Sequence, residues 1–141
     1  MRRHVLAALA MLLVACGGDK ATGPDPVTGS YTLRTVNGGA LPQTFYQDDV
    51  EKDQLFAGTI SLAADHSWTG SLSVDATAIP GGQVLFHAPI PVSGTYALNA
   101  SSITITDPHG LSFSGTVSGG TMTLSTTDLD GVHQTTLVLS K

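Results

Sequence analysis

The chain has 141 residues, of which 41% are hydrophobic and 12% charged, and its formal net charge is −5. A chain of this length is large enough for one domain with a substantial hydrophobic core. An acidic surface with few charges does not follow a phosphate backbone, so we expect no nucleic-acid partner. A single cysteine leaves no internal disulfide, so the core must stabilise the fold.

Residues 1–15 have the layout of a secretory signal peptide. Arg2 and Arg3 give a positive start, and an unbroken apolar run covers residues 5–14. The run is about half as long as the roughly 20 apolar residues of a membrane-spanning helix, and it lacks the polar face of a surface helix. We therefore expect residues 1–15 to direct export and to be removed.

The end of this segment, Leu13-Val14-Ala15-Cys16, resembles the lipobox of bacterial lipoproteins. The resemblance implies a thioether-linked lipid on Cys16, cleavage before it, and acylation of the new amino terminus with a chain such as palmitate. Two or more acyl chains make a stable anchor, so the membrane is an expected partner. Gly17 stands where aspartate would favour the inner membrane, which implies the outer membrane in a Gram-negative host.

Residues 16–28 are expected to be the lipidated cysteine and a flexible tether, because Gly, Pro, Thr and Asp are mixed here without any period. Residues 29–141 are then a single folded domain. Without Arg2 and Arg3 the exported chain has four basic and eleven acidic residues, a balance of −7. Such a surface is not drawn to anionic lipid headgroups.

The domain shows a period of two over most of its length. Apolar residues alternate with Ser and Thr in short runs, which is typical of half-buried antiparallel strands. Turn sequences such as Asn37-Gly38-Gly39 and Ser118-Gly119-Gly120 separate the runs. Residues 47–56 are ambiguous and fit a helical turn or an acidic loop. The alternating runs are SYTLRTV, GTISLAAD, SWTGSLSVD, GTYALN, SITITD, LSFSGTV, MTLSTTD and HQTTLVLS.

Eight to ten short strands predict an all-β fold, either an antiparallel up-and-down barrel or a β-sandwich. Because nearly every gap is a tight turn, strands adjacent in sequence should be adjacent in the sheet, which favours the barrel. A closed barrel also removes exposed strand edges. The β-sandwich is the alternative.

Three short motifs resemble the small lipocalin-like domains of bacterial lipoproteins. They are Gly29-Ser30-Tyr31 at the start of the first run, VNGGALP at residues 36–42, and Gly94-Thr95-Tyr96. The resemblance implies a β-barrel domain, here with tyrosine where lipocalins have the tryptophan of Gly-x-Trp.

The sequence shows no catalytic or metal-binding pattern. His66, His87, His109 and His133 occur singly rather than at the spacing of metal ligands, so we expect no metal and no cofactor. A Gly-x-Ser-x-Gly elbow is missing, and the carboxylates of residues 48–53 are typical of a solvated loop. We therefore do not expect an enzyme.

Four aromatic residues expected on the apolar side of their strands are the candidate ligand-binding residues: Trp68, Phe86, Tyr96 and Phe113. They either line an apolar cup for a lipid-like or aromatic ligand, or fill the core as in many small barrels. Three glycines at inward positions either leave space inside or permit strand coiling. These glycines are Gly58, Gly70 and Gly115.

Together these features predict a lipid-anchored, extracytoplasmic binding protein, monomeric, for a small apolar ligand or another envelope component. The alternative is an envelope interaction, assembly or inhibitor module with a filled barrel. In that case we expect the function on the loops at residues 48–53 and 80–82.

Overall fold

The structure is a computed structural model that describes residues 27–127 and 134–141; the expected signal peptide, Cys16 and most of the tether lie outside them. Alternating apolar and β-branched residues favour extended backbone, and the described residues form ten strands. No helix within this part of the chain could cross a lipid bilayer. The strands are β1 (Gly29–Val36), β2 (Gly39–Ala40), β3 (Gln43–Gln47), β4 (Glu51–Leu62), β5 (Ser67–Ala78), β6 (Val84–Asn99), β7 (Ser102–Thr106), β8 (Ser112–Ser118), β9 (Thr121–Thr126) and β10 (Thr135–Ser140).

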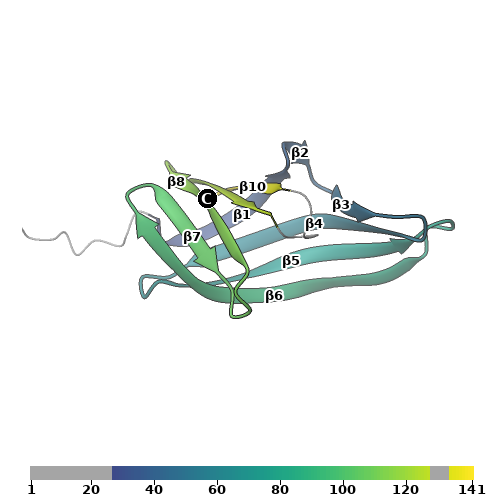
Figure 1. Ribbon diagram of the computed structural model, residues 1–141, viewed down its shortest axis with the longest axis horizontal. Coiled ribbons are helices and arrows are strands. Elements are labelled where there is room, and N and C mark those ends of the chain that lie inside the picture. Colours follow the sequence, from purple (N-terminus) through teal and green to yellow (C-terminus); the bar gives the residue numbers. More distant parts are fainter. Residues whose placement is uncertain (1–26, 128–133) are drawn as a thin grey trace, which may run out of the picture.

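Eight of these strands close into an antiparallel barrel (Figure 1). They pair in the order β1-β10-β9-β8-β7-β6-β5-β4, and residues 29–32 of β1 pair with residues 59–62 of β4 to complete the ring. β2 and β3 lie outside the ring, paired with β1 and β4 respectively. From β4 onward each strand pairs with the next one along the chain. The prediction of an up-and-down barrel rather than a sandwich is confirmed.

The turn between β1 and β2 has the conformation that its sequence predicts. Asn37 and Gly38 both have positive φ, 51° and 78°, as a type I′ turn requires. The N–H of Asn37 donates to the carbonyl oxygen of Thr136 at 2.8 Å, and its Oδ1 accepts from the N–H of Thr136 at 2.7 Å. Asn37 therefore continues the ladder between β1 and β10 past the end of β1.

The barrel interior is filled by side chains from alternate positions of the strands. In β9, for example, Met122 and Leu124 are fully buried while Thr121 is exposed. This alternation places Ser and Thr on the outer wall and one continuous core inside. The core residues are Tyr31, Leu33, Val36, Leu55, Ile60, Leu62, Trp68, Tyr96, Ile103, Ile105, Val117, Met122, Leu124, Leu137 and Leu139.

The two ends of the barrel differ. At the end where residue 27 joins, which we call the entry end, the hydroxyl of Tyr31 donates to the carbonyl oxygen of Val27 at 2.7 Å. There the hydroxyl of Tyr96 likewise donates to the carbonyl oxygen of Ala63 at 2.7 Å. These bonds fix two large side chains across the entry end. At the opposite end, long strands run past the barrel (Figure 1).

This projecting sheet arises because β4, β5 and β6 are longer than the barrel wall. β1 pairs with β4 only at residues 59–62, and β7 pairs with β6 only at residues 95–99. The remainder of the long strands, with β3 alongside β4, extends beyond the ring. We call residues 43–57 and 73–93 the β-extension; its strands reach the side of Figure 1 opposite the β4–β5 turn.

Two expectations from the sequence are wrong in the β-extension. Residues 47–56 do not form a helical turn, and only residues 48–50 form a loop, since residue 47 ends β3 and residues 51–56 begin β4. The barrel also does not remove every strand edge. Within the described chain, residues 84–93 of β6 pair on one side only, with β5. Such an edge is open to other molecules unless its own residues block it.

Candidate functional site

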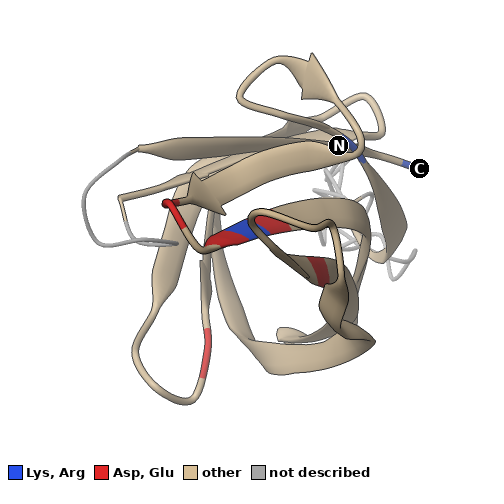
Figure 2. Cartoon of the chain, turned by 90° about the vertical axis from the view of Figure 1, so that its right-hand side faces the viewer, with Lys and Arg blue, Asp and Glu red and all other residues tan. Residues whose placement is uncertain are grey.

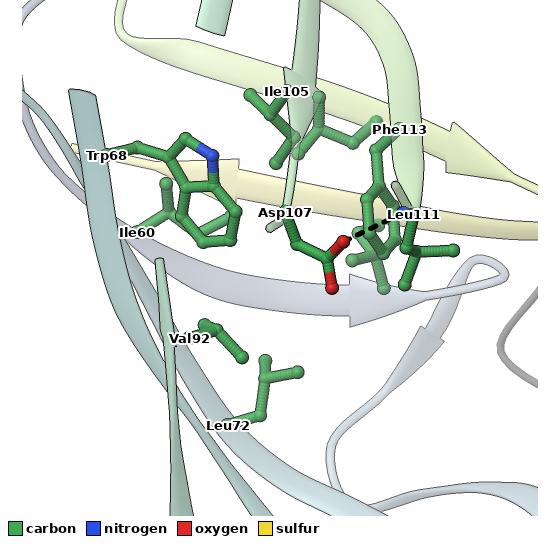
Figure 3. A pocket seen from close by; sticks show the side chains of 10 residues that line it. Ile60, Trp68, Leu72, Val92, Ile105, Asp107, Leu111 and Phe113 are labelled. Atoms are coloured by element: carbon green, nitrogen blue, oxygen red, sulfur yellow. Dashed lines mark hydrogen bonds between the residues drawn. The ribbon is translucent and has the colours of Figure 1, made fainter. Parts of the chain in front are cut away.

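A small apolar cavity opens at the end of the barrel that carries the β-extension (Figure 3). Its volume is about 80 Å³. Trp68 and Phe113 lie on opposite sides of it. Strands β4 to β10 and the β7–β8 loop supply its walls. The lining residues are Ile60, Trp68, Leu72, Val92, Ile105, Asp107, Leu111, Phe113, Leu124 and Leu137.

Asp107 is the one charged residue among those that line the cavity. Its Oδ1 accepts a hydrogen bond from the N–H of Leu111 at 2.8 Å (Figure 3) and another from the N–H of His109 at 2.9 Å. The carboxylate is therefore engaged in folding the β7–β8 loop. The cavity offers apolar contact rather than a pair of groups for acid–base chemistry.

The structure brings together two of the four candidate ligand-binding residues. Trp68, 4% exposed, and the half-buried Phe113 line the cavity, and the indole N–H of Trp68 donates to the carbonyl oxygen of Thr106 at 3.2 Å. Tyr96 is buried at the entry end. Phe86 lies on the β-extension, 45% exposed.

The interior leaves little room for a ligand. Pockets for drug-sized ligands have volumes of about 300–1,000 Å³, so a cavity of about 80 Å³ accommodates only the end of an apolar chain. The inward glycines do not add space. A Cβ on Gly70 would overlap the carbonyl oxygen of Thr59, and one on Gly115 would overlap that of Thr123. These glycines permit close approach of neighbouring strands.

Exposed apolar side chains gather on the β-extension. Phe86 and Ile90, the latter 41% exposed, lie on the same face of β6 as Val92, which lines the cavity. The apolar surface therefore continues from the barrel mouth onto the β-extension. All seven large hydrophobic side chains that the described residues expose belong to it: Tyr46, Val50, Phe56, Val84, Leu85, Phe86 and Ile90.

We call the face of the β-extension that carries Phe86 and Ile90 its inner face, and one row of paired residues shows its composition. Asp53 of β4 is paired with Ala76 of β5, which is paired in turn with Phe86 of β6. Oδ1 of Asp53 is shielded from solvent and has no hydrogen-bond partner among the described residues. The face thus carries a carboxylate on one side and an aromatic ring on the other.

Negative charge gathers on the same segment. Of the described residues, five of seven carboxylates but only one of three basic side chains, Lys52, lie on the β-extension, which gives it a charge of −4. The rest of the described chain has two of each sign. Figure 2 looks onto this end of the molecule and shows the acidic segments around it. The five carboxylates belong to Asp48, Asp49, Glu51, Asp53 and Asp75.

The turn at the tip of the β-extension holds one of these carboxylates in its charged form. Oδ1 of Asp48 accepts from the N–H groups of Val50 and Glu51, each at 2.8 Å, and Oδ2 accepts from the hydroxyl of Tyr46 at 2.8 Å. These bonds, that from Val50 first, lower the pKa of Asp48. The bond to Asp48 and its negative charge raise the pKa of Tyr46. Asp48 therefore stays ionised to a lower pH than a free aspartate does.

A notch of about 320 Å³ separates the free edge of β6 from the β7–β8 loop. It shares Val92 and Asp107 with the cavity, so cavity, notch and β-extension form one connected surface. The notch is lined by Ile90, Pro91, Val92, Ser93, Asp107, Pro108 and His109.

The histidines are dispersed over this structure. Nδ1 of His87 contacts Oδ1 of Asp75 across β5 and β6, on the face opposite Phe86. The ring of His66 lies against that of Tyr96 at the entry end, with centroids 5.2 Å apart. No group of three or more His, Cys, Asp or Glu side chains in residues 27–127 and 134–141 is placed to hold a metal ion. His133 lies outside the described residues.

Sequence reasoning named the two loops at the tip of the β-extension but missed the sheet that carries them. Residues 84–93 belong to none of the predicted runs, because Val84, Leu85 and Phe86 break the alternation and Pro89 and Pro91 argue against an internal strand. Both features fit an edge strand. An apolar segment with two prolines at a spacing of two is the signal that could have identified it.

Comparisons with protein-family models, with curated proteins and with solved structures find no match to this chain.

Proposed function

We propose that this protein is a lipid-anchored binding protein of the bacterial cell envelope, and that it acts by holding another envelope protein on the β-extension. The observation that carries the proposal is the gathering of every large exposed hydrophobic side chain of the described residues on this one segment. Exposed apolar clusters rimmed by polar residues are typical of interaction sites.

The position of the β-extension supports this role. The chain enters the barrel at Val27, at the entry end, and the β-extension projects from the opposite end (Figure 1). A tether that reaches the membrane through Cys16 therefore leaves the binding surface facing away from the point of attachment. The filled barrel acts as a rigid support, since its interior is close-packed.

The anchor itself gives one prediction. Cys16→Ser removes the thiol that a lipid would occupy, so the chain is expected to remain uncleaved and to lose all incorporation of labelled fatty acid. Metabolic labelling followed by detergent-phase partitioning measures both effects. Lack of label on the unmodified protein would contradict lipidation. It would not test the proposed binding surface on the β-extension.

Binding on the β-extension gives a second prediction. A photoreactive benzoyl side chain in place of Phe86 is expected to give one discrete crosslinked product in living cells, because this position is exposed within the apolar surface. The same group at Thr116, an exposed position on the barrel wall, is the matched control and should give no such product. Adding Ile90→Ser should remove the product.

Crosslinking that is equal at positions 86 and 116, or absent from both, would contradict the proposal. A product that survives Ile90→Ser would place the contact outside the apolar face. Each result is read by mass spectrometry of the product, which identifies the partner and the contacting residue.

The cavity supports a second candidate function, the binding of a small apolar ligand, because its walls are apolar apart from Asp107. Only the end of such a ligand fits inside, and the remainder would follow the β-extension. Trp68 is the sole tryptophan and lines the cavity, so its emission reports occupancy. Saturable changes on adding a fatty acid or a naphthalene dye would support this candidate, and silence to both would exclude it.

A further inference from the structure

We infer that the partner held by the β-extension presents a basic amphipathic segment. This segment lies flat on the inner face of the sheet, between Phe86 and the acidic tip at residues 48–51. The inference rests on the proposed function and names the chemistry of the partner. It follows from three features of the surface: its apolar face, its charge, and the form of its free edge.

The apolar face calls for an apolar stripe on the partner. Phe86 and Ile90 stand on the inner face of β6, in line with Val92 at the notch. Aromatic and branched side chains in such a position contribute most when a partner covers them completely. The notch of about 320 Å³ offers room for one large side chain beside them.

The negative charge of the β-extension favours a partner with basic groups next to its apolar stripe. The β-extension carries five carboxylates and one lysine, and Asp53 brings a carboxylate onto the inner face itself. Nucleic acid and anionic lipid headgroups would be repelled. A second copy of this chain, docked through the same face about a two-fold axis, would bring two segments that each carry a charge of −4 close together. A basic partner is the occupant that this field attracts.

The free edge of β6 decides how the partner lies. The N–H of Tyr96 donates to the carbonyl oxygen of His66 at 2.8 Å, so the paired residues Ser67 and Thr95 point their own backbone groups away from each other's strand. In an antiparallel ladder this orientation recurs every second residue. Counted back along β6, Pro91 and Pro89 therefore have the positions that face the free edge.

Proline has no N–H to donate, so two successive donor positions of this edge are blocked. An added strand would lose a hydrogen bond at each of them, whereas a segment lying on the sheet face loses none. The edge thus disfavours strand addition by a partner or by a second copy. Docking on the face, in the manner of an amphipathic helix in a groove, is the mode that remains.

The test uses the full lipidated chain in discs of neutral phospholipid and a fluorescent model peptide of about five helical turns with a leucine stripe and lysines opposite it. One comparison peptide has glutamate in place of lysine, and another has serine in place of leucine. Binding is followed by fluorescence anisotropy, with empty discs subtracted. We expect the basic amphipathic peptide to bind at least about tenfold more tightly than either comparison peptide.

Two sets of variants separate the contributions. Asp48→Asn with Asp49→Asn and Glu51→Gln is expected to weaken binding about tenfold and to flatten its salt dependence. Phe86→Ser with Ile90→Ser is expected to weaken binding by a similar factor. Asp65→Asn is the matched control, because Asp65 holds a turn at the entry end through Ser67 as Asp48 holds its turn, and should leave binding unchanged.

Trp68 emission in each variant shows whether the barrel is folded, and the salt dependence of the unmodified protein needs no variant. Equal affinity for the basic and acidic peptides, or equal loss in the Asp65→Asn control, would overturn the inference. A dimer that depends on Phe86 would also overturn it. If position 86 crosslinks to one protein in cells while no basic peptide binds, the proposed function stands and the inference about partner chemistry falls.

Discussion

Replacing Trp68 with alanine is expected to lower the free energy of unfolding by about 3–5 kcal/mol. The side chain is 4% exposed, and its indole N–H bonds to the carbonyl oxygen of Thr106. Alanine would lose the burial of the ring and merge the space left behind with the adjoining cavity of about 80 Å³. Because the chain has no other tryptophan, urea unfolding would be followed by circular dichroism.

Phe86→Ala is the matched control for this measurement. It removes an aromatic side chain that is 45% exposed and belongs to the β-extension, so the expected loss is below about 1.5 kcal/mol. A loss for Trp68→Ala no larger than that for Phe86→Ala would contradict the filled barrel. The pair of variants therefore distinguishes a residue of the barrel core from a residue of the binding surface. Trp68 is expected to affect stability, whereas Phe86 is expected to affect binding.

The barrel could be predicted from sequence because its determinants are local. Alternation of apolar and hydroxyl residues specifies which face of a strand is buried, and a turn such as Asn37-Gly38 specifies that the chain reverses there. Short turns place each strand from β4 to β10 beside its sequence neighbour, and β1 closes the ring by pairing with β10 and β4. None of these inferences needs to know how far a strand runs.

The candidate site depends on what alternation does not encode. The β-extension exists because β1 and β7 pair with only part of β4 and β6, and pairing lengths are a property of the assembled sheet. The four aromatic residues share an apolar side in sequence, yet Trp68 and Phe113 both line the cavity while Phe86 is 45% exposed on the β-extension. Whether an aromatic residue is buried or exposed depends on whether its part of the strand lies within the barrel or in the β-extension.

The role of the inward glycines likewise could not be predicted from the sequence. The sequence marks glycines at inward positions, but their purpose depends on how closely the next strand approaches. Gly94 is the clearest case: a Cβ there would overlap the carbonyl oxygen of Thr106 and lie 2.7 Å from the indole nitrogen of Trp68. These are the two partners of the indole hydrogen bond. The absent side chain at Gly94 therefore makes room for Trp68 and for β7 at once.

Gly94→Ala is accordingly expected to lower the free energy of unfolding by at least about 3 kcal/mol, because relief of the overlap must move a backbone carbonyl and break the Trp68 bond. Gly58→Ala is the control: the nearest neighbours of the added Cβ are side-chain atoms of Leu72 and Leu33 at 3.0–3.2 Å, which can shift, so a loss of about 1 kcal/mol is expected.

Trp68→Phe removes the indole nitrogen, and in that background Gly94→Ala should cost about 0.5–1.5 kcal/mol less. Denaturant unfolding of the four proteins of this cycle measures the coupling. Additive losses would show that Gly94 serves strand approach alone, and a loss for Gly94→Ala equal to that for Gly58→Ala would contradict the close packing of β6 on β7.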